Sequence, residues 1–212
     1  MEKEIFWSQH AKKFDQTTDY VVGKQDVDII KEEVSRLNDL GDVFEAACGT
    51  GMYTQLLLPH ANSILATDFS NEMVEISKER FKQCSNVTVE QANIKDLQYP
   101  KESFDTVFVG NILHVVDDHE LAFDNCLNLV KVGGRIICLD YCQDKMRFIH
   151  KVSQTYRFLT TYGKPTVKPS KPNFKLVDMI ALFNEHNLQI EKAVLLGKKS
   201  KAVLVVGKKV KQ

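Results

Sequence analysis

The stretch VFEAACGTGMYT, from Val43 to Thr54, decides the fold prediction. It joins an apolar run that carries one acid, Glu45, to Gly49 and Gly51 and then to the start of a helix. Glycine lets a backbone turn sharply and lets a ligand approach the main chain. The free amides at the start of a helix favour a negatively charged group. The stretch therefore predicts a strand, a ligand-binding loop and a helix, in that order.

Apolar runs and helical segments alternate along the chain after this stretch. The expected strands are residues 42–47, 63–68, 87–92, 104–111 and 135–141. The expected helices between them are residues 52–60, 70–81, capped by Ser70, and 120–131, capped by Asp117 or Asp118. Such alternation predicts a parallel sheet with helices on both faces. The strands are near-continuous apolar runs, which is typical of strands covered on both faces.

The C-terminal part of the chain departs from this pattern. The runs LQIEKAVLLG and KAVLVVGKK are separated by KKS alone, and a connection this short forces an antiparallel hairpin. We therefore expect a parallel block of five strands that is completed by an antiparallel hairpin. With 212 residues, the chain is expected to form a single domain, 1–212.

Two segments lie outside the alternation of strands and helices. Residues 5–39 are expected to be helical, and we interpret residues 1–40 as an N-terminal helical cap. Residues 142–172 follow the fifth strand, where open sheets place their ligands, so we expect a lid-like insertion. The alternative is a peripheral helix packed on the sheet. An apolar stripe at helical spacing runs through this insertion, formed by Phe148, Val152, Tyr156 and Leu159.

Charge and cysteine content narrow the function classes. The formal net charge is zero, which removes the usual electrostatic argument for a nucleic-acid or anionic-membrane partner. No signal peptide and no membrane span are expected, because long apolar runs are missing from the sequence. The five cysteines include no Cys-x-x-Cys pair and no His partner at metal spacing, so we expect free thiols, no metal site and a cytoplasmic protein.

The acids around the glycine pair indicate the kind of ligand. Asp68 ends the second expected strand, 17 residues after Gly51, where a carboxylate can accept hydrogen bonds from both hydroxyls of a ribose. Glu45 lies inside the first strand, where it suits a ligand that carries an ammonium, such as S-adenosylmethionine, better than a pyrophosphate. Glu45 and the roughly 40 residues before the first strand also argue against a nicotinamide oxidoreductase.

Several motifs together resemble one family. The pattern Glu-x-Ala-Cys-Gly-Thr-Gly, FSNEMVE after Asp68, QANIKDLQYP, FDTVFVGNILHVVDD and KVGGRI are similar to class I S-adenosylmethionine-dependent methyltransferases. The resemblance covers Val43 to Tyr141 and is strongest to the small-molecule branch, including the quinone methylases. It implies a Rossmann-like, doubly wound, mostly parallel seven-stranded sheet. It also implies methyl transfer from S-adenosyl-L-methionine to a small-molecule acceptor by in-line displacement.

The resemblance also implies a cofactor site. Glu45 would face the ammonium of the cofactor and Asp68 would hold its ribose. The other positions are Ala47, Gly49, Thr50 and Gly51 in the loop beside the methionine part, Phe69 and Met73 on the adenine, Asn93 and Ile94 at its edge, and Asn111 on the methionine side. Three positions depart from the family pattern, because Ala47 stands where glycine is usual, Asn93 where an acid is common and Val132 where proline is common.

His114 is the candidate catalytic residue, because it follows the fourth strand on the face where the methyl group should lie. A base is needed only if the acceptor loses a proton during attack, and imidazole suits that task near neutral pH. The alternative is a hydrogen-bonded histidine that transfers no proton. The candidate substrate-contacting residues are Phe14, Tyr20, His114, Tyr141 and Tyr156.

Two other functions remain open at this stage. One is an RNA or protein methyltransferase, and the other is a non-catalytic protein that binds S-adenosylmethionine. The Asp/Asn-Pro-Pro-Tyr motif of DNA amino-methylases is not found after the fourth strand, where GNILH stands instead. The sequence leaves the acceptor, its accepting atom and the oligomeric state open.

Overall fold

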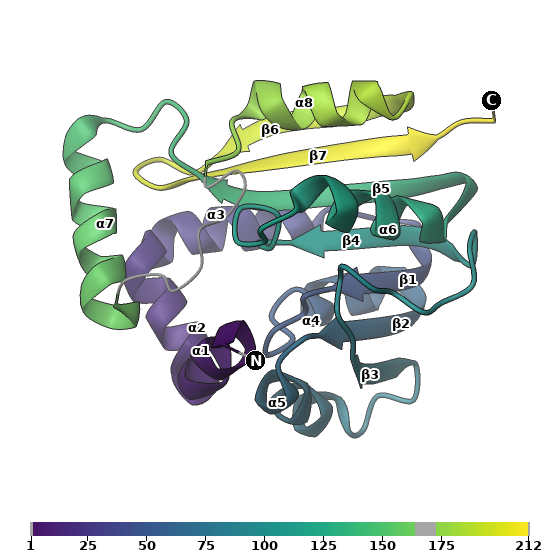
Figure 1. Cartoon of the computed structure of the whole chain (residues 1–212), viewed down its shortest axis with the longest axis horizontal. Helices are drawn as coiled ribbons and strands as arrows, with labels where there is room; N and C mark the ends of the chain where they lie inside the picture. Colours follow the sequence, from purple (N-terminus) through teal and green to yellow (C-terminus); the bar gives the residue numbers. More distant parts are fainter. Residues whose placement is uncertain (1, 164–172, 212) are drawn as a thin grey trace.

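A seven-stranded sheet forms the centre of the molecule (Figure 1). The computed structural model describes residues 2–163 and 173–211. The strand order across the sheet is β3-β2-β1-β4-β5-β7-β6. The strands are β1 Gly41–Ala46, β2 Ala61–Asp68, β3 Val87–Gln91, β4 Phe104–Gly110, β5 Val130–Cys142, β6 Leu188–Leu196 and β7 Lys201–Lys209.

The first five strands pair in parallel and β7 runs antiparallel to both of its neighbours. This confirms the expected parallel block and the expected hairpin of β6 and β7. The second strand of the hairpin, β7, pairs with β5, and the first strand, β6, forms the edge of the sheet.

The start of β5 differs from the prediction. We expected a turn at Gly133 and Gly134 and a strand from Arg135, but β5 begins at Val130 and its pairing with β4 resumes at Arg135 after an irregularity. Gly133 has a φ of +84°, and a Cβ on Gly134 would lie 2.7 Å from the backbone oxygen of Asp105. The two glycines therefore form a bulge within one continuous strand, where β4 and β5 approach too closely for a side chain.

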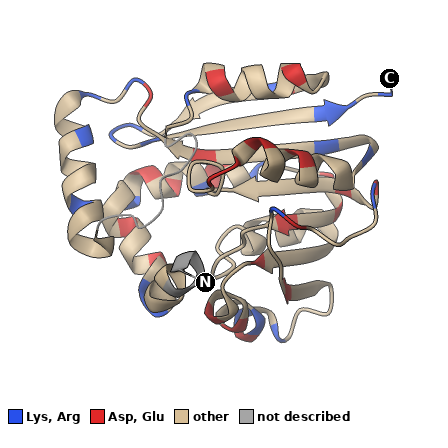
Figure 2. Ribbon diagram, in the orientation of Figure 1, with Lys and Arg blue, Asp and Glu red and all other residues tan. Residues whose placement is uncertain are grey.

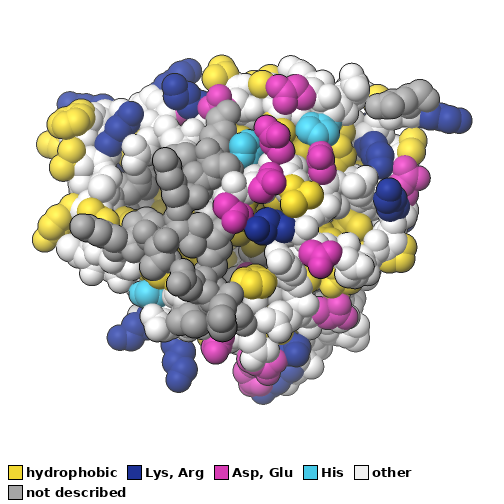
Figure 3. Space-filling model, in the orientation of Figure 1, with side chains coloured by type: hydrophobic (Ala, Val, Ile, Leu, Met, Phe, Trp, Pro, Cys, Tyr) yellow, Lys and Arg dark blue, Asp and Glu magenta, His cyan; other side chains and the backbone are white. Residues whose placement is uncertain are grey.

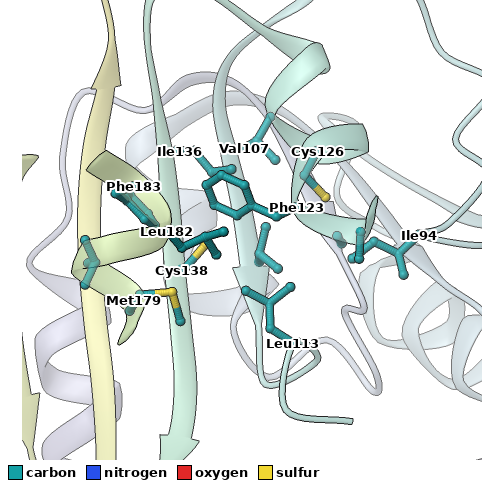
Figure 4. Packing of buried hydrophobic residues seen from close by; sticks show 14 of the residues in the cluster. Ile94, Val107, Leu113, Phe123, Cys126, Ile136, Cys138, Met179, Leu182 and Phe183 are labelled. Carbon is teal, nitrogen blue, oxygen red and sulfur yellow. The ribbon is translucent and has the colours of Figure 1, made fainter. Parts of the chain in front are cut away.

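Helices cover both faces of the sheet, as expected. On one face lie α3 Lys24–Ser35, α4 Thr54–Leu57 and α5 Asn71–Phe81, and on the other lie α6 His119–Leu129 and α8 Leu176–Glu185. In Figure 4, side chains of α6 and α8 meet those of β5, and the labelled ones are Phe123, Cys126, Met179, Leu182, Phe183, Ile136 and Cys138. The expected caps are present, because Ser70 accepts a hydrogen bond from Met73 N and Asp118 accepts one from Leu121 N.

The helical N-terminus lies at the end of the sheet where the parallel strands finish (Figure 1). It consists of α1 Glu2–His10, a 3-10 turn Ala11–Lys13, α2 Phe14–Thr18 and a π-helical turn Asp19–Gly23, which we call together the N-terminal cap. Asp26, at the start of α3, fastens this region to the sheet. Its carboxylate accepts hydrogen bonds from the backbone amides of Lys198, Lys199 and Ser200, at 2.6, 3.1 and 2.8 Å.

Helix α7, Phe148–Tyr162, confirms the expected helix after β5. It packs beside the N-terminal cap, where Arg157 donates to the carbonyl oxygen of Tyr20 at 2.7 Å and the hydroxyls of Tyr162 and Thr17 are 2.7 Å apart. Residues 164–172 of the expected insertion lie outside the described residues. Helices of the described part of the chain are all too short or too polar to cross a bilayer.

Candidate active site

The glycine loop, residues 47–53, connects β1 to α4 in a conformation that needs glycine. Gly49 and Gly51 have φ angles of +56° and +85°. A Cβ on Gly51 would collide with the ring of Phe81, so that no larger residue fits there. Ala47 also has a positive φ, +58°, at the position where the family usually has glycine. The loop thus brings main-chain atoms, rather than side chains, to the end of the sheet.

The side chain of Asp68, at the end of β2, contacts the backbone of this loop. Its Oδ2 accepts a hydrogen bond from Gly49 N at 2.8 Å, and its Oδ1 accepts one from Ser70 N at 2.9 Å. Burial raises the pKa of Asp68 against the lowering effect of these amides. Each carboxylate oxygen can accept more than one hydrogen bond, so the group retains capacity for the hydroxyls of a ligand.

Glu45 is buried beneath the loop with half of its carboxylate unpaired. Its Oε2 accepts a hydrogen bond from Thr54 Oγ1 at 2.6 Å, but its Oε1 has no partner among the described residues. Burial, followed by the neighbouring charge of Asp68, raises the pKa of Glu45 to about 7. A cationic group of a ligand would neutralise this carboxylate and satisfy its free oxygen.

A second group of buried oxygens surrounds Asn111, which follows β4. Asn111 donates from Nδ2 to the hydroxyl of Tyr53 at 2.9 Å, while its Oδ1 is buried and unpartnered within the described structure. The Tyr141 hydroxyl lies beside that of Tyr53, also buried, and makes no hydrogen bond of good geometry with described residues. Burial raises the pKa of Tyr53 to about 12, and the charges of Asp140 and Glu45 add to this shift. The unpartnered oxygens and Glu45 therefore belong to one polar site.

His114 lies in a turn beyond β4 and is held by Asp140, near the end of β5. The two Asp140 oxygens accept from the His114 amide at 3.0 Å and pair with His114 Nδ1. Asp140 is buried, whereas the His114 side chain is 25% exposed. Burial lowers the pKa of His114, but the Asp140 carboxylate outweighs it, so that the pKa is raised overall. With Nδ1 occupied, Nε2 is the nitrogen that can exchange a proton with a ligand.

Comparisons with known proteins agree with this geometry. A family model described as a methyltransferase domain matches residues 44–138. A demethylmenaquinone methyltransferase of Bacillus licheniformis is 28% identical over 162 residues, which are 68% of this chain and 69% of that protein. One of Staphylococcus haemolyticus is 30% identical over 115 residues, and the chain spans about half of its length, 48%. This chain is a class I S-adenosylmethionine-dependent methyltransferase.

Solved structures agree on the fold of this methyltransferase. A SAM-dependent methyltransferase from Aquifex aeolicus has a TM-score of 0.67 at 15% identity, over 94% of this chain and 97% of that one. The N-methyltransferase NodS from Bradyrhizobium japonicum, in complex with S-adenosyl-L-homocysteine, has a TM-score of 0.65 at 16% identity, over 89% and 87%. The cofactor of the methyltransferase is S-adenosylmethionine, and the unpaired Glu45 Oε1 beneath the glycine loop fits its ammonium.

On the side expected to hold the adenine, the methyltransferase combines exposed and buried residues. Phe69 is half-exposed and follows Asp68, whereas Met73 and Ile94 are buried. The Asn93 side chain accepts a hydrogen bond from Lys95 N at 3.1 Å, which stabilises the turn after β3. Its amide nitrogen keeps its two hydrogens for other partners. These four residues therefore lie where the second and third strands end, as a shared site requires.

The N-terminal cap of the methyltransferase closes over the glycine loop. The Phe14 ring lies 3.6 Å from the position that a Cβ on Gly49 would occupy. Asp15 accepts from Thr50 Oγ1 at 2.5 Å and pairs with Arg80 at 2.6 Å. Burial raises the pKa of Asp15, but these two partners outweigh it and the pKa is lowered. The structure therefore brings Phe14 to the glycine loop.

Tyr20 and Tyr156 are not brought to the loop. The Tyr20 side chain is 53% exposed and lies against Arg157, and the Tyr156 side chain is 66% exposed on α7. The apolar stripe of α7 faces solvent, because the helix presents Arg157 and Tyr162 to the cap. Tyr162 is the α7 aromatic that packs against the cap, in edge contact with Trp7 and His10.

Sequence reasoning missed Asp140. The signal was available, because an acid in the run RIICLDY stands near the end of an otherwise apolar strand. An acid at that place in a covered parallel strand needs a partner. Nothing in the linear sequence pointed to His114 as that partner, since Asp140 lies in β5 and His114 follows β4.

Proposed function

We propose that this methyltransferase acts on a small, largely apolar aromatic acceptor that carries a hydroxyl group, a reduced quinone or a related compound. The observation that carries the proposal is the His114–Asp140 pair beside the Glu45 and Asn111 oxygens. It combines a partly exposed imidazole with a buried carboxylate that fixes its orientation. The names of the sequence relatives, demethylmenaquinone methyltransferases, support the acceptor class.

The proposed cofactor contacts follow the geometry of the loop. Glu45 accepts from the ammonium, Asp68 from the ribose hydroxyls, and Asn111 Oδ1 from the methionine part. The remaining cofactor residues are Ala47, Gly49, Thr50, Gly51, Phe69, Met73, Asn93 and Ile94. When bound, S-adenosylmethionine supplies an electrophilic methyl group on a sulfonium. The protein holds the acceptor in line with that methyl group and keeps water out with the cap that carries Phe14.

His114 acts as the general base. Its Nε2 takes the hydroxyl proton of the acceptor, and the electron pair left on oxygen makes the conjugated ring carbon nucleophilic. Asp140 keeps the proton on Nδ1 and stabilises the imidazolium that forms. The ring carbon that accepts the methyl group then loses its own hydrogen as a proton to water, and the imidazolium of His114 returns its proton to the acceptor oxygen, which restores the hydroquinone. We assign Tyr141, whose buried hydroxyl lies near that of Tyr53, to the acceptor side of this arrangement.

A radiolabel transfer assay tests the proposal. Methyl-labelled S-adenosylmethionine is offered with a short-chain naphthohydroquinone, a simple amine, total RNA and a protein mixture. We expect label in the hydroquinone, and a loss of about 10²–10⁴ in kcat for His114→Ala with unchanged S-adenosylhomocysteine affinity. Label in RNA or protein instead would support one of the alternative acceptors. Label in none of the four, with intact cofactor binding, would favour the non-catalytic binding protein.

We also propose a cytoplasmic location without a nucleic-acid partner. All five cysteines are free, and burial raises the pKa of Cys48, Cys126 and Cys138, which keeps these thiols protonated. Free, unreactive thiols are typical of proteins in a reducing compartment. The 28 basic and 28 acidic residues balance, so that the net charge gives no argument for a nucleic-acid partner.

A further inference from the structure

Helix α7 carries an exposed apolar surface that the proposed reaction does not use. Eleven large hydrophobic residues are exposed in the described part of the chain, and five of them lie on this one helix. We call them the α7 face: Phe148, Ile149, Val152, Tyr156 and Leu159, with exposed fractions from 42% to 80%. At 100° per residue they fall within an arc of about 100°. Figure 3 shows hydrophobic side chains gathered at the α7 edge of the molecule.

The opposite side of α7 is fixed to the rest of the molecule. Arg157 donates to Tyr20 O at 2.7 Å, Gln154 donates to Ser200 Oγ at 3.3 Å, and Tyr162 pairs with Thr17. These contacts come from the middle and the C-terminal end of the helix and reach two separate parts of the chain. The outward orientation of the α7 face is therefore set by specific polar contacts on its other side, and no described residue covers it.

The charge around the α7 face is positive. Residues 143–163 contain four lysines and arginines and a single acid, Asp144. Lys145 and Arg147 are exposed just before the helix, and Lys151 lies beside the face. The Gln154–Ser200 contact brings the β6–β7 turn, with exposed Lys198 and Lys199, next to the helix. Figure 2 shows the basic residues of α7 and of this turn on the same side of the molecule.

We propose that the α7 face docks on the surface of an anionic lipid bilayer, with the helix lying in the plane of the interface. Apolar side chains on one side of a helix, flanked by lysine and arginine, are the pattern of such in-plane helices. The basic residues would contact anionic headgroups while Phe148, Ile149 and Val152 enter the acyl boundary. A second copy of the chain fits less well, because a two-fold contact through α7 would bring the same basic flanks together.

The proposal does not depend on the identity of the methyl acceptor. The docked helix is also the one that contacts the N-terminal cap through Tyr162, at the end of the sheet where the site lies (Figure 1). If the acceptor is an apolar quinol, docking places the site beside the phase in which such a molecule dissolves. That advantage follows from the proposed function, whereas binding to vesicles tests the surface alone.

Vesicle flotation with the full chain tests the proposal. We expect the protein to float with mixed phosphatidylcholine–phosphatidylglycerol vesicles, more weakly with phosphatidylcholine vesicles, and less at high salt. The double variant Ile149→Ser with Val152→Ser should lose at least about tenfold in vesicle affinity. The double variant Lys145→Glu with Lys151→Glu should lose the preference for the anionic vesicles. Each variant is checked for unchanged melting temperature and S-adenosylhomocysteine affinity.

A matched control separates the α7 face from general surface hydrophobicity. Val177 on α8 is as exposed as Ile149, 66%, but stands alone on another helix, so Val177→Ser should float like the wild type. Wild-type protein that stays with neither vesicle would overturn the proposal. So would equal losses in Val177→Ser and in the α7 variants. A concentration-dependent dimer that the α7 variants abolish, without vesicle binding, would show that a second copy is the true occupant.

Discussion

At the scale of single residues, the buried carboxylate of Glu45 destabilises the folded protein when it is ionised. Its pKa is about 7 in the folded chain, against an ordinary value of 4.5 for glutamate. The folded state therefore holds a proton that the unfolded state has already released between these pH values. It follows that the free energy of unfolding falls as pH rises from about 4.5 to about 7, by roughly 3 kcal/mol, and stays low above that window. Asp68, whose pKa is also raised, acts in the same direction.

Glu45→Gln is expected to stabilise the cofactor-free protein above pH 7 while weakening its affinity for S-adenosylhomocysteine. The gain arises because the variant buries no charge, and the loss arises because the ammonium has lost its counter-charge. Urea denaturation between pH 5 and pH 9 measures the first effect, and calorimetry measures the second. Glu191→Gln, on an exposed position of β6, is the control and should change neither. A deaminated cofactor analogue should bind wild type and Glu45→Gln equally, and a difference between them would contradict the ammonium contact.

The His114–Asp140 pair makes a prediction about the pH dependence of catalysis. Only neutral imidazole can accept a proton, so kcat/KM should rise with pH through a pKa above the usual 6.5 of histidine. Asp140→Asn removes the interaction that raises this pKa and leaves the burial that lowers it. The rising limb should then move to lower pH and the plateau should fall, because the imidazolium has lost its counter-charge.

The surface offers a matched control for this prediction. His186, at the C-terminal end of α8, pairs through Nε2 with Asp124 of α6 at 2.7 Å. Asp124→Asn therefore removes a comparable contact elsewhere. It should leave the pH profile unchanged. An unmoved limb in Asp140→Asn would mean that another group titrates in the profile and that His114 transfers no proton.

At the scale of secondary-structure elements, the attachment of α3 to the β6–β7 turn depends on one side chain. Asp26→Ala leaves three backbone amides of that turn without their acceptor, and we expect a loss of about 3 kcal/mol in the free energy of unfolding. Asp26→Asn keeps an acceptor oxygen and should lose less. Asp28→Ala, two residues along α3, removes only an exposed pair with Lys24 at 3.5 Å and should cost little. Urea denaturation ranks the three variants, and equal losses would show that the turn is held by something else.

The elements also show how far the sequence could predict the fold. The strands β1 to β5 and the β6–β7 hairpin were predictable, because their apolar runs are separated by glycine, proline and capping residues. The position of β7 next to β5 was not predictable, because both strands of the hairpin are apolar and the sequence does not show which of them pairs with the parallel block. Helix α8 has no counterpart among the expected elements, although Met179, Leu182 and Phe183 stand at helical spacing.

The candidate site shows the same division. The cofactor loop and Asp68 were predictable because their spacing along the chain is fixed by a strand and a helix. Asp140 was not, because its partner His114 follows another strand. The stripe on α7 was correctly predicted as one face of a helix, but not its direction. A row of apolar residues at helical spacing is the same whether it covers a ligand or meets a surface outside the chain.

At the scale of the whole molecule, a net charge of zero conceals an uneven distribution. Figure 2 shows acidic residues along α6 and α8 and basic residues on α7 and the nearby turn. The argument from net charge against an anionic membrane therefore averages over two opposite regions. Screening limits each region to neighbours within about 10 Å at moderate salt. A bilayer would then meet only the basic region, while attraction over longer distances would remain weak.

The contacts of Asp15 have a kinetic consequence. Asp15 holds Thr50 of the glycine loop and Arg80 of α5 together, so we expect exchange of the cofactor to require both contacts to part. The time for which spent cofactor stays bound would then depend on the opening of these two contacts. The hydroxyl of Tyr162 on α7 bonds to Thr17, two residues after Asp15, so that a partner bound to α7 would also affect the release of spent cofactor.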